Sequence, residues 1–436
     1  MSEQRPIGVI GAGWVGLVTA ACFAELGHRV IAVDIDAAKV DALSRGEVPI
    51  HEPGIEELLE RNRERLRFTT EMGEVLEGAR LLFCCVDTPP TYSGDADLSR
   101  VQAVLSQLRG EGDHALVMKS TVPAGTGRAI RRDAPGLAYV SCPEFLKEGS
   151  AVDDFLHPDR VVIGADGGDG WAADGVEEIY RPLEGELVRT DVASAEMIKL
   201  ASNAFLATKI SFVNEIANVC EEVGADVSEV ARGMGLDQRI GPSFLRAGIG
   251  YGGSCFPKDV SALKQLAGNT GYHFQLLNAV IEVNELQKRR VIGKLEKHLG
   301  SLAGKNIALL GLAFKPDTDD MREASSLVLA ARLQGEGAEV RAYDPVAEGA
   351  AKELLPNVEL AESPDQALDG ADAAVLVTEW PEFAELDWAA LRGRMSNPLI
   401  VDGRNFLDAA ALRAAGYTYE GIGRPSNGGA AGGAAQ

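Results

Sequence analysis

The 436-residue sequence lacks the features that would place it in a membrane, secreted or nucleic-acid-binding class. No uninterrupted apolar run approaches the roughly 20 residues that a membrane-spanning helix needs. The N-terminus has no basic segment leading into a long apolar stretch, so we expect no signal peptide. Basic residues are few, 42 against 65 acidic ones. The formal net charge of -23 therefore disfavours nucleic acid and anionic membranes as partners.

Cysteine is also scarce. Six cysteines stand at uneven spacing without a Cys-x-x-Cys pair, and the six histidines are scattered. This pattern excludes a disulfide-rich secreted scaffold and predicts no metal site. We expect a protein of the reducing cytoplasm, in which a cysteine is free to take a chemical role.

The chain is too long for one ordinary domain of roughly 100–200 residues, so two or three domains are expected. At the N-terminus a short apolar strand precedes a glycine turn, a helix over Leu17–Leu26 and a second strand over Arg29–Val33. Further strands are expected at Leu81–Val86, Ala115–Lys119 and Ala138–Ser141. Such alternation predicts a parallel sheet flanked by helices.

The middle and the end of the chain differ from each other. Residues 193–223 contain neither glycine nor proline and predict one long helix, and a second helical stretch is expected over about 259–298. Strands are then expected at Ile307–Leu310, Glu339–Tyr343, Ala373–Val377 and Leu399–Val401. We therefore expect an α/β protein with two Rossmann-like, doubly wound parallel-sheet domains joined by a long-helix middle.

The first glycine turn has the spacing of a dinucleotide-binding site. Gly11, Gly13 and Gly16 form a G-x-G-x-x-G pattern between strand and helix. The first glycine permits a tight turn, the second lets the backbone approach a pyrophosphate, and the third allows close packing of helix on strand. Asp34 closes the second strand, where a carboxylate binds ribose hydroxyls and repels a 2′-phosphate. The pattern predicts NAD rather than NADP as the cofactor.

A second glycine-rich segment, GGSCFPKD at 252–259, carries a cysteine that could act as a nucleophile. Pro257 suits the first turn of a helix, so Cys255 is expected just ahead of a helix N-terminus. There the helix dipole and Lys258 would stabilise a thiolate. A small buried cysteine beside a turn is the alternative.

Other polar residues offer chemistry, each with an ordinary structural alternative. Lys199 and Asn203 are spaced i, i+4 on the long helix and could donate hydrogen bonds to an oxyanion, or form a solvated helix face. Glu144 and Glu148 could act as a general base and a ligand contact, or be exposed carboxylates.

Two threonines follow expected strands. Thr88 and Thr121 come at the C-terminal ends of these strands, the edge at which open α/β sheets bind ligands. As bare sequence, both segments are also ordinary strand-ending turns.

Taken in order, these pieces resemble the nucleotide-sugar dehydrogenases, the family of UDP-glucose and GDP-mannose dehydrogenases, over residues 5–424. The matching segments are GAGWVGL (11–17), EPGIEELL (52–59), STVP (120–123), PEFLKEG (143–149), PDRVVIG (158–164), KLASN (199–203), DQRIGPSFLRAGIGYGGSCFPKD (237–259), GLAFKPDTDDMREA (311–324) and DGRN (402–405). The stretch from Asp237 to Gly241 resembles the glucose branch. Two residues depart from the family pattern, Trp14 for a usual tyrosine and Cys142 for a common asparagine. We interpret Cys84 and Cys85 as core.

The resemblance implies three domains. They are an N-terminal NAD-binding Rossmann domain (1–192), a central helical dimerisation domain with the catalytic cysteine (193–300) and a C-terminal UDP-sugar-binding Rossmann-like domain (301–424). A disordered Gly/Ala-rich tail (425–436) would follow. The resemblance also implies a homodimer or a higher homo-oligomer.

The reaction that the resemblance implies is an NAD-dependent, four-electron oxidation of UDP-glucose at C6 to UDP-glucuronate, with two NAD reduced per substrate. Cys255 would hold the sugar first as a thiohemiacetal and then as a thioester. The other catalytic roles fall to Lys199 and Asn203 as oxyanion donors, Glu144 and Asp259 in the proton transfers of water attack, and Thr121 through an ordered water.

The binding residues are carried over in the same way. The cofactor is expected against Gly11, Gly13, Val15, Gly16, Asp34, Lys39, Thr88, Thr121, Glu148, Lys258 and Arg322. UDP-glucose is expected against Glu144, Phe145, Leu146, Lys147, Glu148, Lys199, Asn203, Phe244, Leu245, Arg246, Ala247, Gly248, Gly252, Lys315 and Arg404, with Arg239 reaching in from the partner subunit. A doubly charged pyrophosphate needs fixed cations, so a local basic pocket is reasonable even in an acidic protein.

Three alternatives stay open. A sister dehydrogenase would act on another UDP-sugar, such as an N-acetylated hexosamine. A 3-hydroxyacid dehydrogenase would transfer a single hydride and would not need Cys255. A cofactor-binding scaffold would turn nothing over. The number of NADH released per substrate separates these classes.

Overall fold

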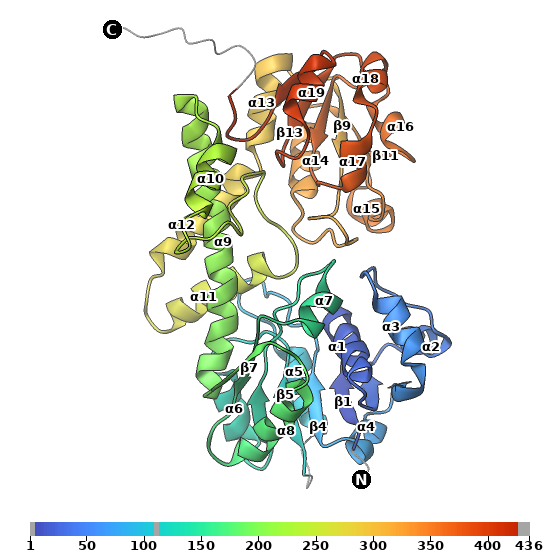
Figure 1. Ribbon diagram of the computed structural model, residues 1–436, viewed down its shortest axis with the longest axis vertical. Coiled ribbons are helices and arrows are strands. Elements are labelled where there is room, and N and C mark those ends of the chain that lie inside the picture. The colour runs from blue at the N-terminus through green and yellow to red at the C-terminus, as the bar shows by residue number, and fades with distance from the viewer. Residues whose placement is uncertain (1–4, 109–112, 426–436) are drawn as a thin grey trace. The chain divides into compact units, whose positions relative to one another are not determined.

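The computed structural model describes residues 5–108 and 113–425, which form two compact units (Figure 1). The first unit comprises Met1–Ser202 and Ser261–His273, and the second comprises Asn203–Val260 and Phe274–Gln436. The tail expected to be disordered, 425–436, lies outside the described residues apart from Pro425. No helix within the described ranges is both long enough and apolar enough to cross a bilayer.

The first unit is built on an eight-stranded sheet. The strand order is β3-β2-β1-β4-β5-β6-β7-β8, and all neighbours are parallel except β6 and β7. The strands are β1 (Ile7–Ile10), β2 (Val30–Val33), β3 (Leu66–Thr69), β4 (Leu81–Cys84), β5 (Ala115–Met118), β6 (Ala138–Ser141), β7 (Arg160–Gly164) and β8 (Glu186–Thr190). Because β1 lies between β2 and β4, the chain changes direction across the sheet at β1, and parallel sheets bind ligands at such a point.

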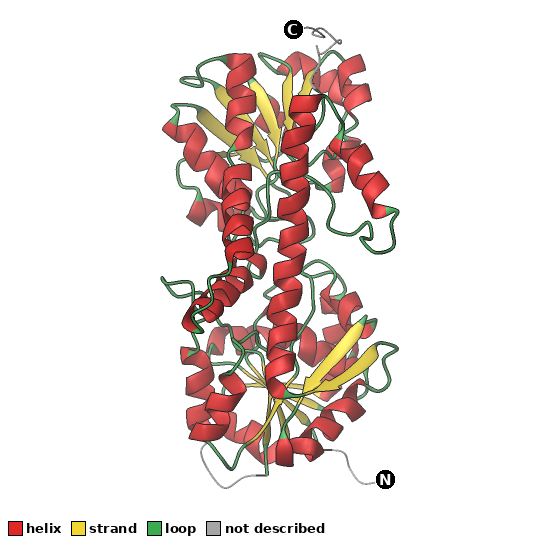
Figure 2. Ribbon diagram, turned by 90° about the vertical axis from the view of Figure 1, so that its left-hand side faces the viewer, coloured by secondary structure: helices red, strands yellow, loops and turns green. Residues whose placement is uncertain are grey.

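Helices cover both faces of this sheet (Figure 2). They are α1 (Trp14–Glu25), α2 (Ala37–Arg45), α3 (Ile55–Arg61), α4 (Met72–Gly78), α5 (Ser99–Gln107), α6 (Thr126–Asp133), α7 (Ala151–Leu156) and α8 (Gly170–Tyr180). Strand residues alternate between the two faces: Phe83 packs with α1, α7 and α8, whereas its neighbours Leu82 and Cys84 pack with α4, α5 and α6. This alternation confirms the expected doubly wound arrangement.

The helical middle begins with α9 (Val192–Val223), the long helix expected from the absence of glycine and proline. The short α10 (Val227–Gly235) follows. The region expected as one helical stretch over 259–298 is in fact three helices, α11 (Phe256–Asn269), α12 (Gln275–Gln287) and α13 (Arg290–Leu299). Gly271 adopts a left-handed conformation (φ 82°) between the first two, which ends the helical run there.

The second unit contains a six-stranded, fully parallel sheet in the order β11-β10-β9-β12-β13-β14. Its strands are β9 (Asn306–Leu310), β10 (Glu339–Tyr343), β11 (Glu359–Leu360), β12 (Ala373–Leu376), β13 (Leu399–Asp402) and β14 (Thr418–Glu420). Its helices are α14 (Ser325–Gly335), α15 (Glu348–Leu354), α16 (Pro364–Leu368), α17 (Pro381–Glu385), α18 (Trp388–Leu391) and α19 (Ala409–Ala414). The sequence β10-β9-β12 repeats the β2-β1-β4 arrangement, so the expectation of two related α/β sheets is confirmed.

The core of the first unit is centred on an aromatic group. Phe23 of α1 is fully buried and meets Phe83 edge-to-face at a centroid distance of 4.7 Å. It also meets Phe155 at 5.4 Å and Tyr180 at 5.6 Å. Offset and edge-to-face rings of this kind stabilise a core beyond the area that they bury.

Phe23→Ala should lower the free energy of unfolding by about 3–5 kcal/mol, because three rings lose their common partner and a cavity remains. Urea denaturation followed by near-ultraviolet circular dichroism measures the change. Tyr92→Ala, at a fully exposed position, is the control and should stay within about 0.5 kcal/mol of the parent chain. A Phe23→Ala protein as stable as that control would contradict the assignment of this core.

Candidate active site

The glycine turn after β1 forms a cradle in which two of the three positions, Gly11 and Gly16, fit only glycine. Gly11 has φ 92°, and a Cβ atom at Gly16 would lie 1.8 Å from the carbonyl oxygen of Gly11. Gly13 immediately precedes α1, so the positive end of that helix faces the turn. Close backbone approach beside a helix N-terminus is the arrangement that a dinucleotide pyrophosphate requires, so these residues fit the expected NAD.

Asp34 stands at the end of β2 and is held by three donors. Its Oδ2 atom accepts hydrogen bonds from Ala12 N (2.7 Å) and Lys39 Nζ (3.1 Å), and its Oδ1 atom accepts one from Asp36 N (3.0 Å). Burial alone would raise the pKa of Asp34, but the two backbone hydrogen bonds and Lys39 together hold it below its ordinary value. The structure thus brings together the expected cofactor residues Asp34 and Lys39 and keeps the carboxylate charged.

Further expected residues follow the other parallel strands. Thr88 comes after β4 and donates its hydroxyl to the carbonyl of Thr121, which comes after β5, at 2.8 Å. Glu144 comes after β6. Because β1, β2, β4, β5 and β6 are parallel, their carboxyl ends lie at one edge of the sheet. The glycine turn, Asp34, both threonines and Glu144 therefore share that edge.

Glu144 and Lys199 form a buried ion pair. Lys199 Nζ lies 2.8 Å from Glu144 Oε1, and the two side chains are only 4% and 6% exposed. Glu144 Oε2 also accepts a hydrogen bond from Leu146 N at 2.7 Å. Burial would raise the pKa of Glu144, but the ammonium of Lys199 outweighs it and holds the pKa below its usual range. A solvated helix surface and an exposed carboxylate, the alternatives for these two residues, are both excluded.

The rest of the PEFLKEG loop differs in exposure. Phe145 is half-buried, and its ring centroid lies 5.4 Å from Lys199 Nζ. Lys147 is exposed and pairs with Asp154 at 2.8 Å. Glu148 is half-buried. The loop thus presents a mixture of apolar and charged side chains beside the buried pair.

Glu52 positions this loop, a role that reasoning from the sequence missed. Its carboxylate is buried and accepts hydrogen bonds from Trp14 Nε1 (3.0 Å), Gly149 N (2.8 Å) and Ala151 N (2.8 Å). It therefore ties the PEFLKEG loop to the start of α1. The EPGIEELL segment was the available signal. Trp14, a departure from the family pattern, contributes its indole N–H to this link.

The cysteines divide into two kinds. Cys84, Cys85 and Cys142 are buried, and burial raises the pKa of each thiol, to about 11 for Cys84. Their interpretation as core is confirmed for Cys84 and Cys85. Cys255 is partly exposed, whereas the other five cysteines are all buried.

Cys255 occupies the position expected from the sequence. It directly precedes α11, and its carbonyl accepts the first-turn hydrogen bond from Asp259 N at 2.8 Å. Its sulfur lies 3.6 Å from Ser254 Oγ. The thiol thus lies at the positive end of a 14-residue helix and is partly exposed, so the buried-core alternative is wrong.

Asn203 and Asp259 meet in the same unit as Cys255. Asn203 Nδ2 donates to Asp259 Oδ2 at 2.6 Å, and both side chains are buried. Lys258 Nζ lies 3.1 Å from Asp259 Oδ1. Asn203 follows Lys199 by four residues on α9, so the expected shared helix face holds.

The loop before Cys255 packs tightly on the segment after β9. A Cβ atom at Gly252 would lie 2.2 Å from the carbonyl oxygen of Glu323, and Gly253 N donates to Arg322 O at 2.9 Å. Gly252 is therefore required by close backbone approach. Lys315 lies on the same segment, between β9 and α14.

Residues 244–248 approach the end of β13. A Cβ atom at Gly248 would lie 2.9 Å from Gly403 O, and Arg246 Nε donates to Arg404 O at 3.2 Å. Arg404 in turn donates to Gly250 O at 2.9 Å. Leu245, Arg246 and Ala247 line a cavity of about 330 Å³. Phe244 opens this run in a left-handed conformation (φ 63°).

Arg239 does not contact the residues near the end of β13. Its side chain is exposed and pairs with Asp237 of its own segment at 2.6 Å. Within the described ranges, no group of three or more His, Cys, Asp and Glu side chains is placed to hold a metal ion.

Comparison with known proteins covers nearly the whole chain. Models of three domains of the UDP-glucose/GDP-mannose dehydrogenase family match it: the NAD binding domain at residues 5–184, the central domain at 193–286 and the UDP binding domain at 308–409. The chain is 48% identical to the UDP-glucose 6-dehydrogenase YwqF of Bacillus subtilis, over 96% of this chain and 97% of that protein.

Two further relatives agree. A UDP-glucose 6-dehydrogenase of Pseudomonas aeruginosa is also 48% identical, over 96% of this chain and 98% of its own length. The solved structure of a UDP-glucose dehydrogenase from Pyrobaculum islandicum superimposes with a TM-score of 0.89 at 39% identity, covering 97% of this chain and 98% of that one. The chain therefore belongs to the UDP-glucose/GDP-mannose dehydrogenase family.

Proposed function

We propose that this chain catalyses the NAD-dependent oxidation of UDP-glucose at C6 to UDP-glucuronate and reduces two NAD per substrate. The observation that carries the proposal is Cys255, the one partly exposed thiol among six described cysteines, placed directly ahead of α11. A single hydride transfer needs no such nucleophile, whereas a two-step oxidation to a carboxylate does. The identity to UDP-glucose 6-dehydrogenases supports UDP-glucose as the substrate.

The cofactor would lie on the glycine cradle. Gly11, Gly13 and Gly16 would admit its pyrophosphate, and Asp34 with Lys39 would face its ribose. NAD, when bound, supplies the hydride acceptor for both oxidations. Further contacts are proposed for Val15, Thr88, Thr121, Glu148, Lys258 and Arg322.

Cys255 would carry the sugar between the two oxidations. Loss of a hydride and a hydroxyl proton from C6 leaves an aldehyde, and the sulfur adds to its carbon to form a thiohemiacetal. Loss of a second hydride and of the remaining hydroxyl proton gives a thioester. Water then attacks the acyl carbon, the carbon–sulfur bond breaks, and the carboxylate leaves while the thiol is restored.

The buried polar residues would stabilise the negative charge that develops on the oxygen at C6 and would accept protons. The ammonium of Lys199 and the amide of Asn203, one helical turn apart, would donate hydrogen bonds to the oxyanion. Glu144 and Asp259 would accept the protons released during water attack, and Thr121 would orient a water. The depressed pKa of Glu144 means that this carboxylate is ionised beside Lys199.

The sugar nucleotide needs cations for its pyrophosphate. Arg246 and Arg404 lie in contact near the end of β13, which supports their assignment to the substrate. The remaining substrate contacts are proposed for Glu144, Phe145, Leu146, Lys147, Glu148, Phe244, Leu245, Ala247, Gly248, Gly252 and Lys315. Arg239, exposed in its own subunit, is proposed to serve the partner's substrate.

We propose further that the chain self-associates through α9, within the three-part division 1–192, 193–300 and 301–424. Phe205, Phe212 and Val219 are all exposed and recur every seven residues, so they form one stripe along the helix. Met197 and Val223 are exposed towards its two ends. Because a monomer seldom exposes so continuous an apolar stripe, a second copy of this chain is its proposed partner.

Two NADH should be released per UDP-glucose consumed in the parent protein, followed at 340 nm with the sugar limiting. Cys255→Ser should abolish nearly all of this turnover, since an alkoxide leaves far less readily than a thiolate. Its affinity for NAD, measured by calorimetry, should not change. A ratio of one, or an active Cys255→Ser variant, would remove the covalent route.

Asp34→Ala should weaken NAD binding by about 1–3 kcal/mol, because charge-assisted hydrogen bonds to the ribose are lost. Calorimetric titration with NAD measures the effect. Asp41→Ala, which removes an exposed carboxylate from the neighbouring α2, is the matched control and should bind NAD normally. Equal affinities in the two variants would contradict the placement of the ribose.

Phe212→Glu should shift the protein towards a monomer, because a charge placed in an apolar interface must be desolvated. Light scattering coupled to size exclusion measures the mass. Leu354→Glu on α15 is a matched control, since both side chains are 50% exposed. A mass that is the same in Phe212→Glu as in the parent protein would rule out this face as the interface.

A further inference from the structure

A dense group of basic residues occurs where the proposed chemistry assigns none. Residues 288–298, KRRVIGKLEKH, contain five lysine and arginine residues, one histidine and one glutamate in a chain whose net charge is -23. Most of them lie on α13. An acidic protein concentrates cations in this way where an anion must be held against the overall field.

Four of these basic residues line a cavity of about 470 Å³ in the second unit. Its volume is within the ordinary range for small-molecule sites, roughly 300–1,000 Å³. It is lined by Glu221, Glu222, Leu286, Arg289, Arg290, Gly293, Lys294, Lys297 and Arg424. Arg289 and Gly293 also line a neighbouring cavity of about 460 Å³, so the two spaces meet along α13.

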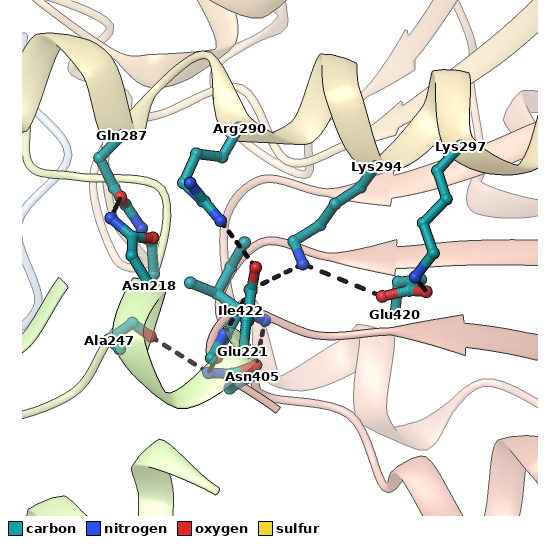
Figure 3. A network of polar contacts seen from close by, with 12 residues as sticks. Asn218, Glu221, Ala247, Gln287, Arg290, Lys294, Lys297, Asn405, Glu420 and Ile422 are labelled. Atoms are coloured by element: carbon teal, nitrogen blue, oxygen red, sulfur yellow. Dashed lines mark hydrogen bonds and ion pairs between the residues drawn. The ribbon is translucent and has the colours of Figure 1, made fainter. Parts of the chain in front are cut away.

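Two carboxylates fix the cations in place (Figure 3). Glu221 pairs with Arg290 and Lys294, each at 2.7 Å, and accepts a hydrogen bond from Gly423 N at 2.7 Å. Glu420 pairs with Lys297 at 2.7 Å.

The same carboxylates stay ionised. Burial would raise the pKa of Glu221 and of Glu420, but the basic partners hold both values below the ordinary one. Glu420 also accepts from His298 at 2.8 Å. The ammonium and guanidinium groups are therefore oriented before any ligand arrives, which lowers the entropic cost of binding.

The cations still exceed the carboxylates. Five basic side chains line the cavity against two acidic ones, and counting Glu420 as well does not remove the excess. Arg289 is exposed, and among the described residues no carboxylate pairs with its guanidinium. A Cβ atom at Gly293 would meet nothing within 4 Å, so a ligand can approach the helix backbone there.

We propose that this cavity is a binding site for a compact polyanion that carries at least two phosphate groups. Guanidinium forks match the paired oxygens of a phosphate, and the cavity contributes three of them, from Arg289, Arg290 and Arg424. The negative charges of Glu221 and Glu222 would repel an anion that carries a single charge. The ligand must therefore carry more than one negative charge. None of the residues proposed for catalysis, NAD or UDP-glucose takes part.

Calorimetric titration with inorganic tripolyphosphate tests the site. UDP and NAD are present at saturation, so that both nucleotide sites are blocked, and the read-out is binding rather than turnover. We expect one equivalent to bind per chain and the affinity to fall as salt is raised. Arg289→Ala should weaken the binding about tenfold, the worth of one charge-assisted contact.

A pair of matched variants separates charge from size. Gly293→Glu and Gly293→Gln add the same volume to the cavity, and only the first adds a negative charge. We expect the glutamate to weaken binding about tenfold more than the glutamine. Lys352→Ala, which removes an exposed cation from α15, should leave the affinity unchanged. None of these variants should alter the oxidation of UDP-glucose measured without polyphosphate.

Several results would overturn the proposal. Tripolyphosphate that fails to bind once UDP and NAD are saturating would show that it enters only the nucleotide sites. Affinities within twofold of one another in the parent protein, Arg289→Ala and Gly293→Glu would place binding elsewhere. ATP is titrated in parallel, since tight binding of ATP matched by adenosine would mean that a base, and not phosphate, is recognised.

Discussion

The buried ion pair between Lys199 and Glu144 is the interaction on which the candidate site at the carboxyl edge of the first sheet depends. Burying either charge alone would cost several kcal/mol, so each side chain requires the other. The pair joins the start of α9 to the end of β6. It also sets the direction of the Lys199 side chain, and Asn203 follows on the same helix face one turn later. The ammonium group of Lys199 thus belongs to a structural ion pair, and it is the same group that is proposed above as an oxyanion donor.

The two parallel sheets show how one architecture acquires two uses. In each, an acidic residue ends the strand beside the central one and reaches the turn that follows the central strand. Asp344 is buried and accepts hydrogen bonds from Leu312 N, Ala313 N and Trp380 Nε1. Its carboxylate is therefore hydrogen-bonded to groups of the protein. Asp34 is buried as well and accepts from Ala12 N, but it also pairs with Lys39, whose side chain is 28% exposed. Only the first sheet carries the G-x-G-x-x-G turn beside such an acid.

Local patterns were predicted well and distant partners were not. The glycine turn, the strands and the start of the helix at Cys255 depend on residues within a few positions of one another. The spacing of residues in the sequence was therefore enough to predict them. Glu52 accepts hydrogen bonds from residues 38, 97 and 99 positions away, and its role could not be read from its neighbours. The side chain of Trp14 was likewise overlooked, because a glycine turn was expected to act through its backbone. The single helical stretch expected over 259–298 was wrong because Gly271 was not recognised as a helix end.

The contrast between one accessible thiol and five buried ones has a consequence for how this protein meets oxidants and electrophiles. Thiolate character and accessibility together govern the oxidation of cysteine to sulfenic acid and beyond. Five sulfurs are shielded by the packing around them, whereas Cys255 is both partly accessible and beside a helix N-terminus. Among the cysteines, peroxide or an alkylating agent therefore has one accessible target, and this is the sulfur atom that the proposed reaction needs.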